Sequence, residues 1–147
     1  MIKTIYLSSI NYEVLEFSLN LLTNIYKTNK EVNGIYVNYI YRDNLSVAIM
    51  ILISNKSLPI EILSKFNKLS TELYNSMGIK IEVYNSLSDN YSDDILLRRR
   101  WEAACDLING DILYDKTGIY KELKENLLST KKEFLPSYIH TLKINKK

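Results

Sequence analysis

The sequence predicts a single α+β domain built on a mixed or antiparallel sheet of four or five strands, with helices packed mainly on one face. Size, composition and hydrophobic periodicity support this prediction. At 147 residues the chain has the common size of one domain. Hydrophobic residues make up 46% and charged residues 24%, which is typical of folded globular proteins. Segments with the two-residue period of a strand alternate along the chain with segments that have the 3.6-residue period of a helix.

The first part of the chain predicts a strand and then a long helix. Residues 3–8 alternate and are rich in residues that favour strands. Asn11 can cap the helix that follows, which we expect to continue to about residue 29. The apolar residues of this helix recur at the helical period, so we expect one buried face made of Val14, Phe17, Leu21, Leu22 and Ile25.

A hairpin is predicted next. Residues 35–41 and 45–53 have strand character and flank Arg42-Asp43-Asn44, where Asp and Asn favour a tight turn because their side chains bond the local backbone. Residues 47–53 are apolar at every position. Such a run is typical of a strand covered on both faces, so we expect a central strand that is paired on both sides.

The remaining elements are predicted from their boundary residues. Ser57 and Pro59 suit the start of a second helix and Gly78 its end, and residues 79–84 alternate as a strand. We expect a third helix from Ser92 to Asn109, a short strand over residues 112–114, and a fourth helix over residues 117–128. We expect residues 1–128 to form the domain and residues 129–147 to form a basic C-terminal tail.

Composition excludes several classes of protein. The net charge of +2 is too small to indicate nucleic-acid binding by itself. Cys105 is the only cysteine, which excludes a disulfide within the chain and a cysteine-built metal site. The longest apolar run, residues 47–53, is far shorter than a membrane span, and the first residues lack the pattern of a secretion signal. We therefore expect a cytoplasmic protein that does not enter a membrane, and we expect no cofactor.

The order of the predicted elements fits more than one fold. Through residue 84 it is β-α-β-β-α-β, which matches the ferredoxin-like plan of two helices on one face of an antiparallel sheet. With C-terminal helices added, such a domain is expected to bind protein or RNA and to dimerise through its sheet or helices. The central order helix-strand-strand-helix-strand also belongs to another fold, which the following motif favours.

The distinctive motif lies between the last two predicted helices. It reads Gly110-Asp111-Ile112-Leu113-Tyr114-Asp115-Lys116-Thr117-Gly118. Three segments upstream of this motif belong to the same layout. They are Gly34-Ile35-Tyr36-Val37, the apolar residues 47–53 and residues 78–83. This layout, from about residue 11 to residue 128, resembles the minimal nucleotidyltransferase domains of the polymerase β-like kind, in which a similar strand and turn follow the catalytic sheet.

The resemblance implies a catalytic site that this sequence lacks. Members of the family hold the nucleotide phosphates with a Gly-Ser pair and bind two magnesium ions with a D-x-D motif and a third carboxylate. Here the Gly-Ser position reads Asn38-Tyr39 and the D-x-D position reads Ser46-Val47-Ala48. Glu82 alone matches the third carboxylate, and for this residue we favour the alternative of a solvated or salt-bridged sheet residue. The resemblance therefore implies a binding or regulatory module without catalytic residues or bound metal. An active nucleotidyltransferase with a displaced site is the enzyme-class alternative.

Basic residues form one dense cluster. Arg98, Arg99 and Arg100 are consecutive in the third predicted helix, where they spread over roughly 200° of its circumference. The guanidinium group of arginine can donate paired hydrogen bonds to phosphate oxygens, which would make this cluster a phosphate or nucleic-acid contact. The alternative is a solvated helix face that pairs with nearby acidic residues. We favour the solvated face and expect the partner of the domain to be a protein or a second copy of the chain.

Two other groups carry weaker hypotheses. Tyr36, Tyr39 and Tyr41 share one predicted strand, and an aromatic sheet surface can stack single-stranded bases. The usual RNA-recognition signature is absent, so we favour core or dimer packing for them. A nucleophilic pair of Cys105 and His140 is conceivable, but Cys105 lies on an apolar helix stripe, where cysteine is inert.

Overall fold

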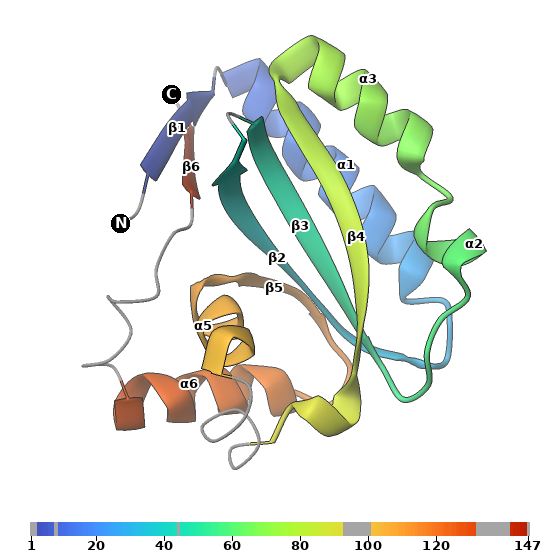
Figure 1. Cartoon of the computed structure of the whole chain (residues 1–147), viewed down its shortest axis with the longest axis vertical. Coiled ribbons are helices and arrows are strands. Elements are labelled where there is room, and N and C mark those ends of the chain that lie inside the picture. The colour runs from blue at the N-terminus through green and yellow to red at the C-terminus, as the bar shows by residue number, and fades with distance from the viewer. Residues whose placement is uncertain (1–2, 8, 44, 93–100, 132–141, 147) are drawn as a thin grey trace.

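The computed structural model describes residues 3–7, 9–43, 45–92, 101–131 and 142–146 (Figure 1). Both expected element types are present, so the predicted α+β class is confirmed. In chain order the elements are β1 (Lys3–Leu7), α1 (Ser9–Tyr26), β2 (Val32–Arg42), β3 (Leu45–Ser54), α2 (Ile60–Leu63), α3 (Asn67–Met77), β4 (Ile79–Leu87), the 3₁₀ turn η1 (Ser88–Asn90), α5 (Trp101–Asn109), β5 (Asp111–Asp115), α6 (Ile119–Lys131) and β6 (Leu142–Lys146).

Within the described residues, the main sheet has four strands in the order β4-β3-β2-β5. Strands β2 and β3 form the predicted antiparallel hairpin, and Asp43 in its turn has a φ of 52°, which a short side chain that bonds local backbone tolerates. Strand β5 is antiparallel to β2, whereas β4 is parallel to β3. The helices between β3 and β4 supply the crossover that a parallel pair requires.

The ferredoxin-like alternative is wrong. That plan needs an antiparallel sheet that contains the first strand. In this structure β1 lies outside the main sheet and pairs with β6 in a separate two-stranded parallel sheet, and β3 and β4 are parallel neighbours (Figure 1). The order from α1 through β4 is helix, hairpin, helices and strand, which is the central order that the nucleotidyltransferase resemblance predicts.

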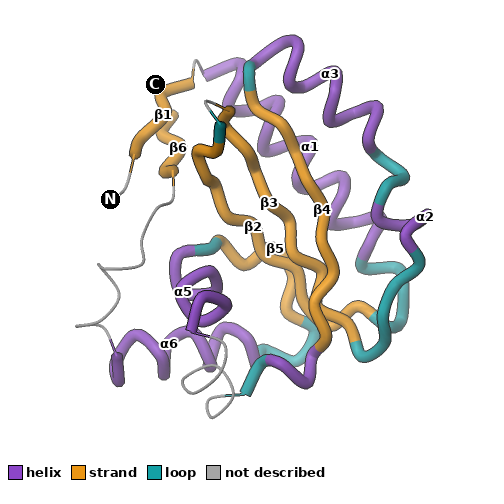
Figure 2. Tube along the Cα trace, viewed as in Figure 1, coloured by secondary structure: helices purple, strands orange, loops and turns teal. Residues whose placement is uncertain are grey.

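The main sheet is covered on both faces. Strands alternate their side chains, so one face, here called the α1 face, presents residues such as Ala48, Met50 and Ile81 to α1, α2 and α3. The opposite face, here called the α5 face, presents Tyr36 and Ile53 to α5 and α6. Figure 2 shows α1 and α3 along one side of the sheet and α5 and α6 along the other. The first three helices lie on one face as expected, and α5 and α6 add a second layer.

The central position of β3 is confirmed. It pairs with β2 on one side and with β4 on the other. Val47 is 1% exposed on the α5 face, and Ala48 and Met50 are 0% exposed on the α1 face. Because both faces of the strand exclude water, apolar residues are needed at successive positions rather than at alternate ones.

The buried face of α1 differs from the prediction. The residues that pack on the sheet are Leu15, Leu19, Leu22 and Tyr26. Of the predicted stripe, Leu22 alone is fully buried, whereas Val14, Phe17 and Leu21 are exposed. The helix carries two apolar stripes with the same period, and periodicity cannot show which of them meets the sheet.

Two further elements differ from their predictions. The expected second helix is divided into α2 and α3, and near the division the hydroxyl of Tyr26 donates to the carbonyl of Ile62 at 3.0 Å. The C-terminal region expected to be a tail contains the end of α6, up to Lys131, and strand β6. Backbone pairing with β1 gives β6 its partner, and that partner is remote in the sequence. In the described part of the chain, no helix has both the length and the apolar character to cross a membrane.

Candidate functional site

Glu82 lies on β4, on the α5 face of the sheet. Its pairing partner on β3 is Ile49, and the pairing partner of Ile49 on β2 is Asn38. These three residues therefore form one row across the sheet. The row contains one carboxylate, one aliphatic side chain and one amide, so the sheet register places no second carboxylate beside Glu82.

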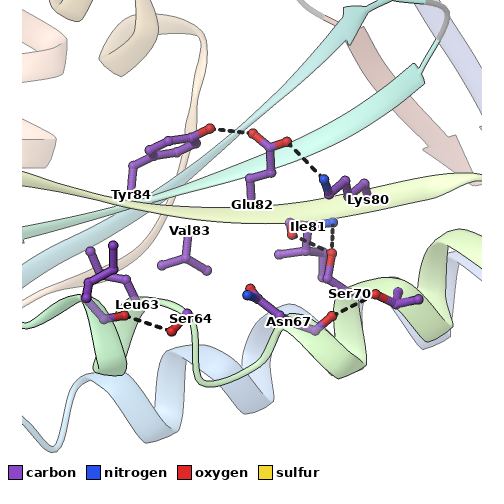
Figure 3. A pocket seen from close by; sticks show the side chains of 11 residues that line it. Leu63, Ser64, Asn67, Ser70, Lys80, Ile81, Glu82, Val83 and Tyr84 are labelled. Carbon is purple, nitrogen blue, oxygen red and sulfur yellow. Dashed lines mark hydrogen bonds and ion pairs between the residues drawn. The ribbon is translucent and has the colours of Figure 1, made fainter.

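Both carboxylate oxygens of Glu82 have partners. The Arg42 guanidinium donates to Oε2 at 2.5 Å, and the Tyr84 hydroxyl donates to Oε1 at 2.6 Å. Lys80 Nζ lies 3.7 Å from Oε2. Figure 3 shows the Tyr84 and Lys80 contacts along β4. The side chain of Glu82 is 13% exposed, so this network holds the carboxylate at the margin of the core.

The electrostatics favour an ionised Glu82. Burial raises the pKa of its carboxyl. Hydrogen bonds from Tyr84 and Arg42, together with the charges of Arg42 and Lys80, lower this pKa by more than burial raises it. The net pKa is below the ordinary value of 4.5. A metal ion at Glu82 would have to displace Arg42 or Tyr84, because those groups occupy the oxygens that would bind it. The described residues contain no cluster of three or more His, Cys, Asp or Glu that could hold a metal ion.

The residues at the D-x-D position point away from Glu82. Ser46 pairs with Ile79 and Ala48 pairs with Ile81, so both belong to the α1 face. Ala48 is 0% exposed and lies in the core beneath the helices. On β3 the positions that share a face with Glu82 are instead Val47 and Ile49, which have no group that binds a cation.

The residues at the Gly-Ser position have structural contacts. Asn38 is 4% exposed, and its Nδ2 donates to the carbonyl of Asp106 at 2.9 Å, which ties β2 to α5. Tyr39 points to the α1 face, where it lines a cavity of about 250 Å³ with Glu16 and Asp111. Burial raises the pKa of the Tyr39 hydroxyl, and the charge of Asp111 raises it further. A phosphate turn requires backbone N–H groups that no bulky side chain covers, and both Asn38 and Tyr39 carry a bulky side chain.

The motif from Gly110 to Gly118 has a structural basis. A Cβ at Gly110 would lie 2.8 Å from the Tyr36 ring, so only glycine permits this approach of the turn to β2. Asp115 Oδ2 accepts a hydrogen bond of 2.8 Å from the backbone N–H of Lys121 in the first turn of α6. Gly118 has a φ of 79°, the left-handed conformation that glycine adopts without strain.

A cavity of about 500 Å³ lies along the outer edge of β4 (Figure 3). Its residues come from α2, α3 and β4 and include Leu63, Asn67, Ser70 and Val83. The hydroxyl of Ser70 donates to the carbonyl of Ile81 at 2.6 Å and accepts from its N–H at 3.0 Å. This hydroxyl closes the edge of the sheet at Ile81, because it satisfies the two backbone groups that another strand would need.

Arg98, Arg99, Arg100 and His140 lie outside the described residues. Cys105 is 3% exposed in the cluster between α5, α6 and the sheet.

The tyrosines do not form one surface. Tyr36 is 2% exposed on the α5 face, where its hydroxyl bonds that of Tyr91 at 2.9 Å. Tyr39 packs against the α1 core. Tyr41 is 42% exposed at the end of the hairpin. Opposite faces and burial thus separate these rings, and core packing accounts for Tyr36 and Tyr39.

Arg42 and Tyr84 are the members of the Glu82 network that sequence reasoning did not select. The alternation Lys80, Glu82, Tyr84 was a usable signal for Tyr84, because residues two apart share a strand face. No signal was available for Arg42, which lies 40 residues from Glu82 in the sequence and reaches it only through the pairing of β2, β3 and β4.

Comparisons with known proteins return distant likenesses. No protein-family model and no curated protein matches the sequence. A solved structure of a mutant MntA-HpeT toxin–antitoxin is similar with a TM-score of 0.40 and 11% identity, covering 86% of this chain and 90% of that chain. A complex of tri-AMPylated Shewanella oneidensis HEPN toxin with MNT antitoxin gives a TM-score of 0.37 and 13% identity, covering 82% and 90%. Both TM-scores are below 0.5, so we base no conclusion about this chain on them.

Proposed function

We propose that this chain is a nucleotidyltransferase-like domain that does not transfer nucleotides and acts as a binding or regulatory module. The order of α1, the β2–β3 hairpin, α2, α3 and β4 supports the nucleotidyltransferase-like part of the proposal, together with the Gly110–Gly118 motif. The row Glu82, Ile49, Asn38 supports the absence of transfer, and it is the observation that carries the proposal.

The chemistry of nucleotidyl transfer explains why the residues of this row matter. Nucleotidyl transfer brings polyanionic groups together, and the metal ions that offset their charge are held by clustered carboxylates. Glu82 is a single carboxylate whose oxygens are bonded by Arg42 and Tyr84. Val47 and Ile49, the β3 residues on the same face, cannot supply the missing ligands. A domain of this kind has a nucleotidyltransferase-like fold without the metal-binding carboxylates, and binding is the function that we propose for it.

The test is incubation of the protein with radiolabelled ATP and UTP, with magnesium or manganese, against itself and cellular extract. We expect no label in protein, RNA or small acceptors. Thermal-shift measurements with the four nucleotides and either metal should show no rise in melting temperature, since a ligand that binds the native state must stabilise it.

A Glu82→Gln variant is the matched control, because it keeps the size of the side chain and removes its charge. Label transfer by the parent that disappears in Glu82→Gln would establish a displaced active site and overturn the proposal. A metal-dependent rise of several degrees with any nucleotide would equally contradict the absence of a nucleotide site.

A further inference from the structure

The solvent-facing side of α1 carries an apolar stripe. Val14 is 41% exposed, Phe17 is 68% exposed and Leu21 is 41% exposed. Their spacing of three and four residues places them on one face over two turns of the helix. Figures 1 and 2 show that the side of α1 toward the sheet is already occupied by β2, β3 and β4. The stripe therefore lies opposite the residues that form the core.

The stripe differs from the other exposed apolar residues of the described chain. Those residues are Tyr41, Ile60, Tyr74, Tyr84, Leu87, Ile119 and Leu128. No other described helix gathers three of them on successive turns. Single exposed hydrophobic residues are normal on a protein surface, but a contiguous apolar stripe on a helix is typical of a surface that binds another protein.

The charges around the stripe are self-complementary. Glu13 lies next to Val14 in the first half of α1, which has no Lys or Arg anywhere along its length. Lys27 and Lys30 follow directly after the helix, and both are exposed. Two copies of α1 packed antiparallel would place the acidic half of each helix beside the basic end of the other. A parallel pair would instead place like charges together.

We infer that α1 mediates a symmetric dimer of this chain, with Val14, Phe17 and Leu21 of each copy packed against the same residues of the other in an antiparallel pair. The interface is isologous, as in most homodimers. The occupant of the stripe is thus a second copy, because one surface supplies both the apolar contact and the opposite charges.

The size of the stripe sets the strength expected of the dimer. The exposed parts of the three side chains amount to on the order of 300 Å² per copy, given side chains of roughly 200 Å². Stable interfaces bury at least about 600 Å² per partner, so the polar flanks of α1 must contribute as well. We therefore expect a dissociation constant in roughly the micromolar range.

The test is sedimentation velocity of the full chain from about 1 µM to about 200 µM. The parent should pass from monomer to dimer across this range. Phe17→Glu should raise the dissociation constant roughly tenfold or more, because it places a charge at the centre of the apolar contact. Its urea unfolding midpoint should match that of the parent, since Phe17 is mostly exposed. Phe17→Ser serves if the charged variant fails to fold.

The matched control is Ile60→Glu. Ile60 is 73% exposed and belongs to α2 rather than to α1, and the substitution adds the same charge. It should leave the dimer unchanged. Glu13→Lys alone should weaken the dimer at low salt, and the pair Glu13→Lys with Lys27→Glu should restore it if the helices are antiparallel.

Three results would overturn the inference. They are a parent that stays monomeric throughout, a dimer that Phe17→Glu leaves intact, and a charge exchange that does not restore association. The inference is independent of catalysis, so a positive label-transfer result would leave this test unaffected.

Discussion

Ser70→Ala should destabilise the protein more than any ordinary loss of a surface hydroxyl. Ser70 is 6% exposed on α3, and its hydroxyl bonds both the N–H and the carbonyl of Ile81 at the edge of β4. Ile81 is itself 5% exposed, so its backbone groups are largely shielded from solvent. Each bond contributes about 1 kcal/mol, and each buried backbone group left unpaired adds a further cost of about 1 kcal/mol or more. We therefore expect a loss of about 2–4 kcal/mol in the free energy of unfolding.

The assay is urea unfolding followed by far-UV circular dichroism, with a thermal scan beside it. The expected fall in melting temperature is roughly 5–12 °C for a chain of this length. Thr71→Ala is the matched control, because Thr71 is the next residue of α3 and its hydroxyl bonds the carbonyl of Asn67 at 3.1 Å on an exposed surface. That variant should change stability by about 0.5 kcal/mol or less.

An effect of Ser70→Ala no larger than that of Thr71→Ala would refute the reasoning. It would mean that solvent reaches the Ile81 backbone and that α3 does not close this edge of the sheet.

Two further predictions concern β3 and Glu82. Ala48→Lys should abolish folding, because Ala48 is 0% exposed beneath the helices and a buried, unpaired ammonium is very costly. A cooperative unfolding transition like that of the parent would contradict the placement of β3. Glu82 stabilises the fold in its ionised form, because its pKa is lowered in the native state. The stability difference between the parent and Glu82→Gln should therefore be full above the ordinary pKa of 4.5 and should shrink as the pH falls below that value. Urea unfolding of both proteins between about pH 7 and about pH 3 measures this, and a difference that does not change with pH would exclude the Arg42–Glu82 interaction as its source.

Much of the fold followed from local sequence patterns. Residues 47–53 predicted a central strand because a strand covered on both faces must be apolar at every position, and β3 is that strand. Asp43 predicted the hairpin turn, and Gly78 predicted the end of a helix, where it has a φ of 74°. These features depend on a few neighbouring residues, so the sequence alone determines them.

The tertiary structure decided which face each pattern uses. Helix α1 has two apolar stripes of the same period, and packing on the sheet buried Leu15 and Leu19 while it left Phe17 exposed. Sheet register likewise placed Ala48 on the face opposite Glu82, because a shift of one residue along a strand reverses the direction of every side chain.

The candidate site depended on the tertiary structure most of all. The sequence selected Glu82 and showed that the Gly-Ser and D-x-D residues are missing. It could not bring Arg42 to that carboxylate, because the contact spans three strands and 40 residues of chain. Local patterns determine the elements of this protein, whereas the charges that surround Glu82 are set by the register between strands, which no single segment contains.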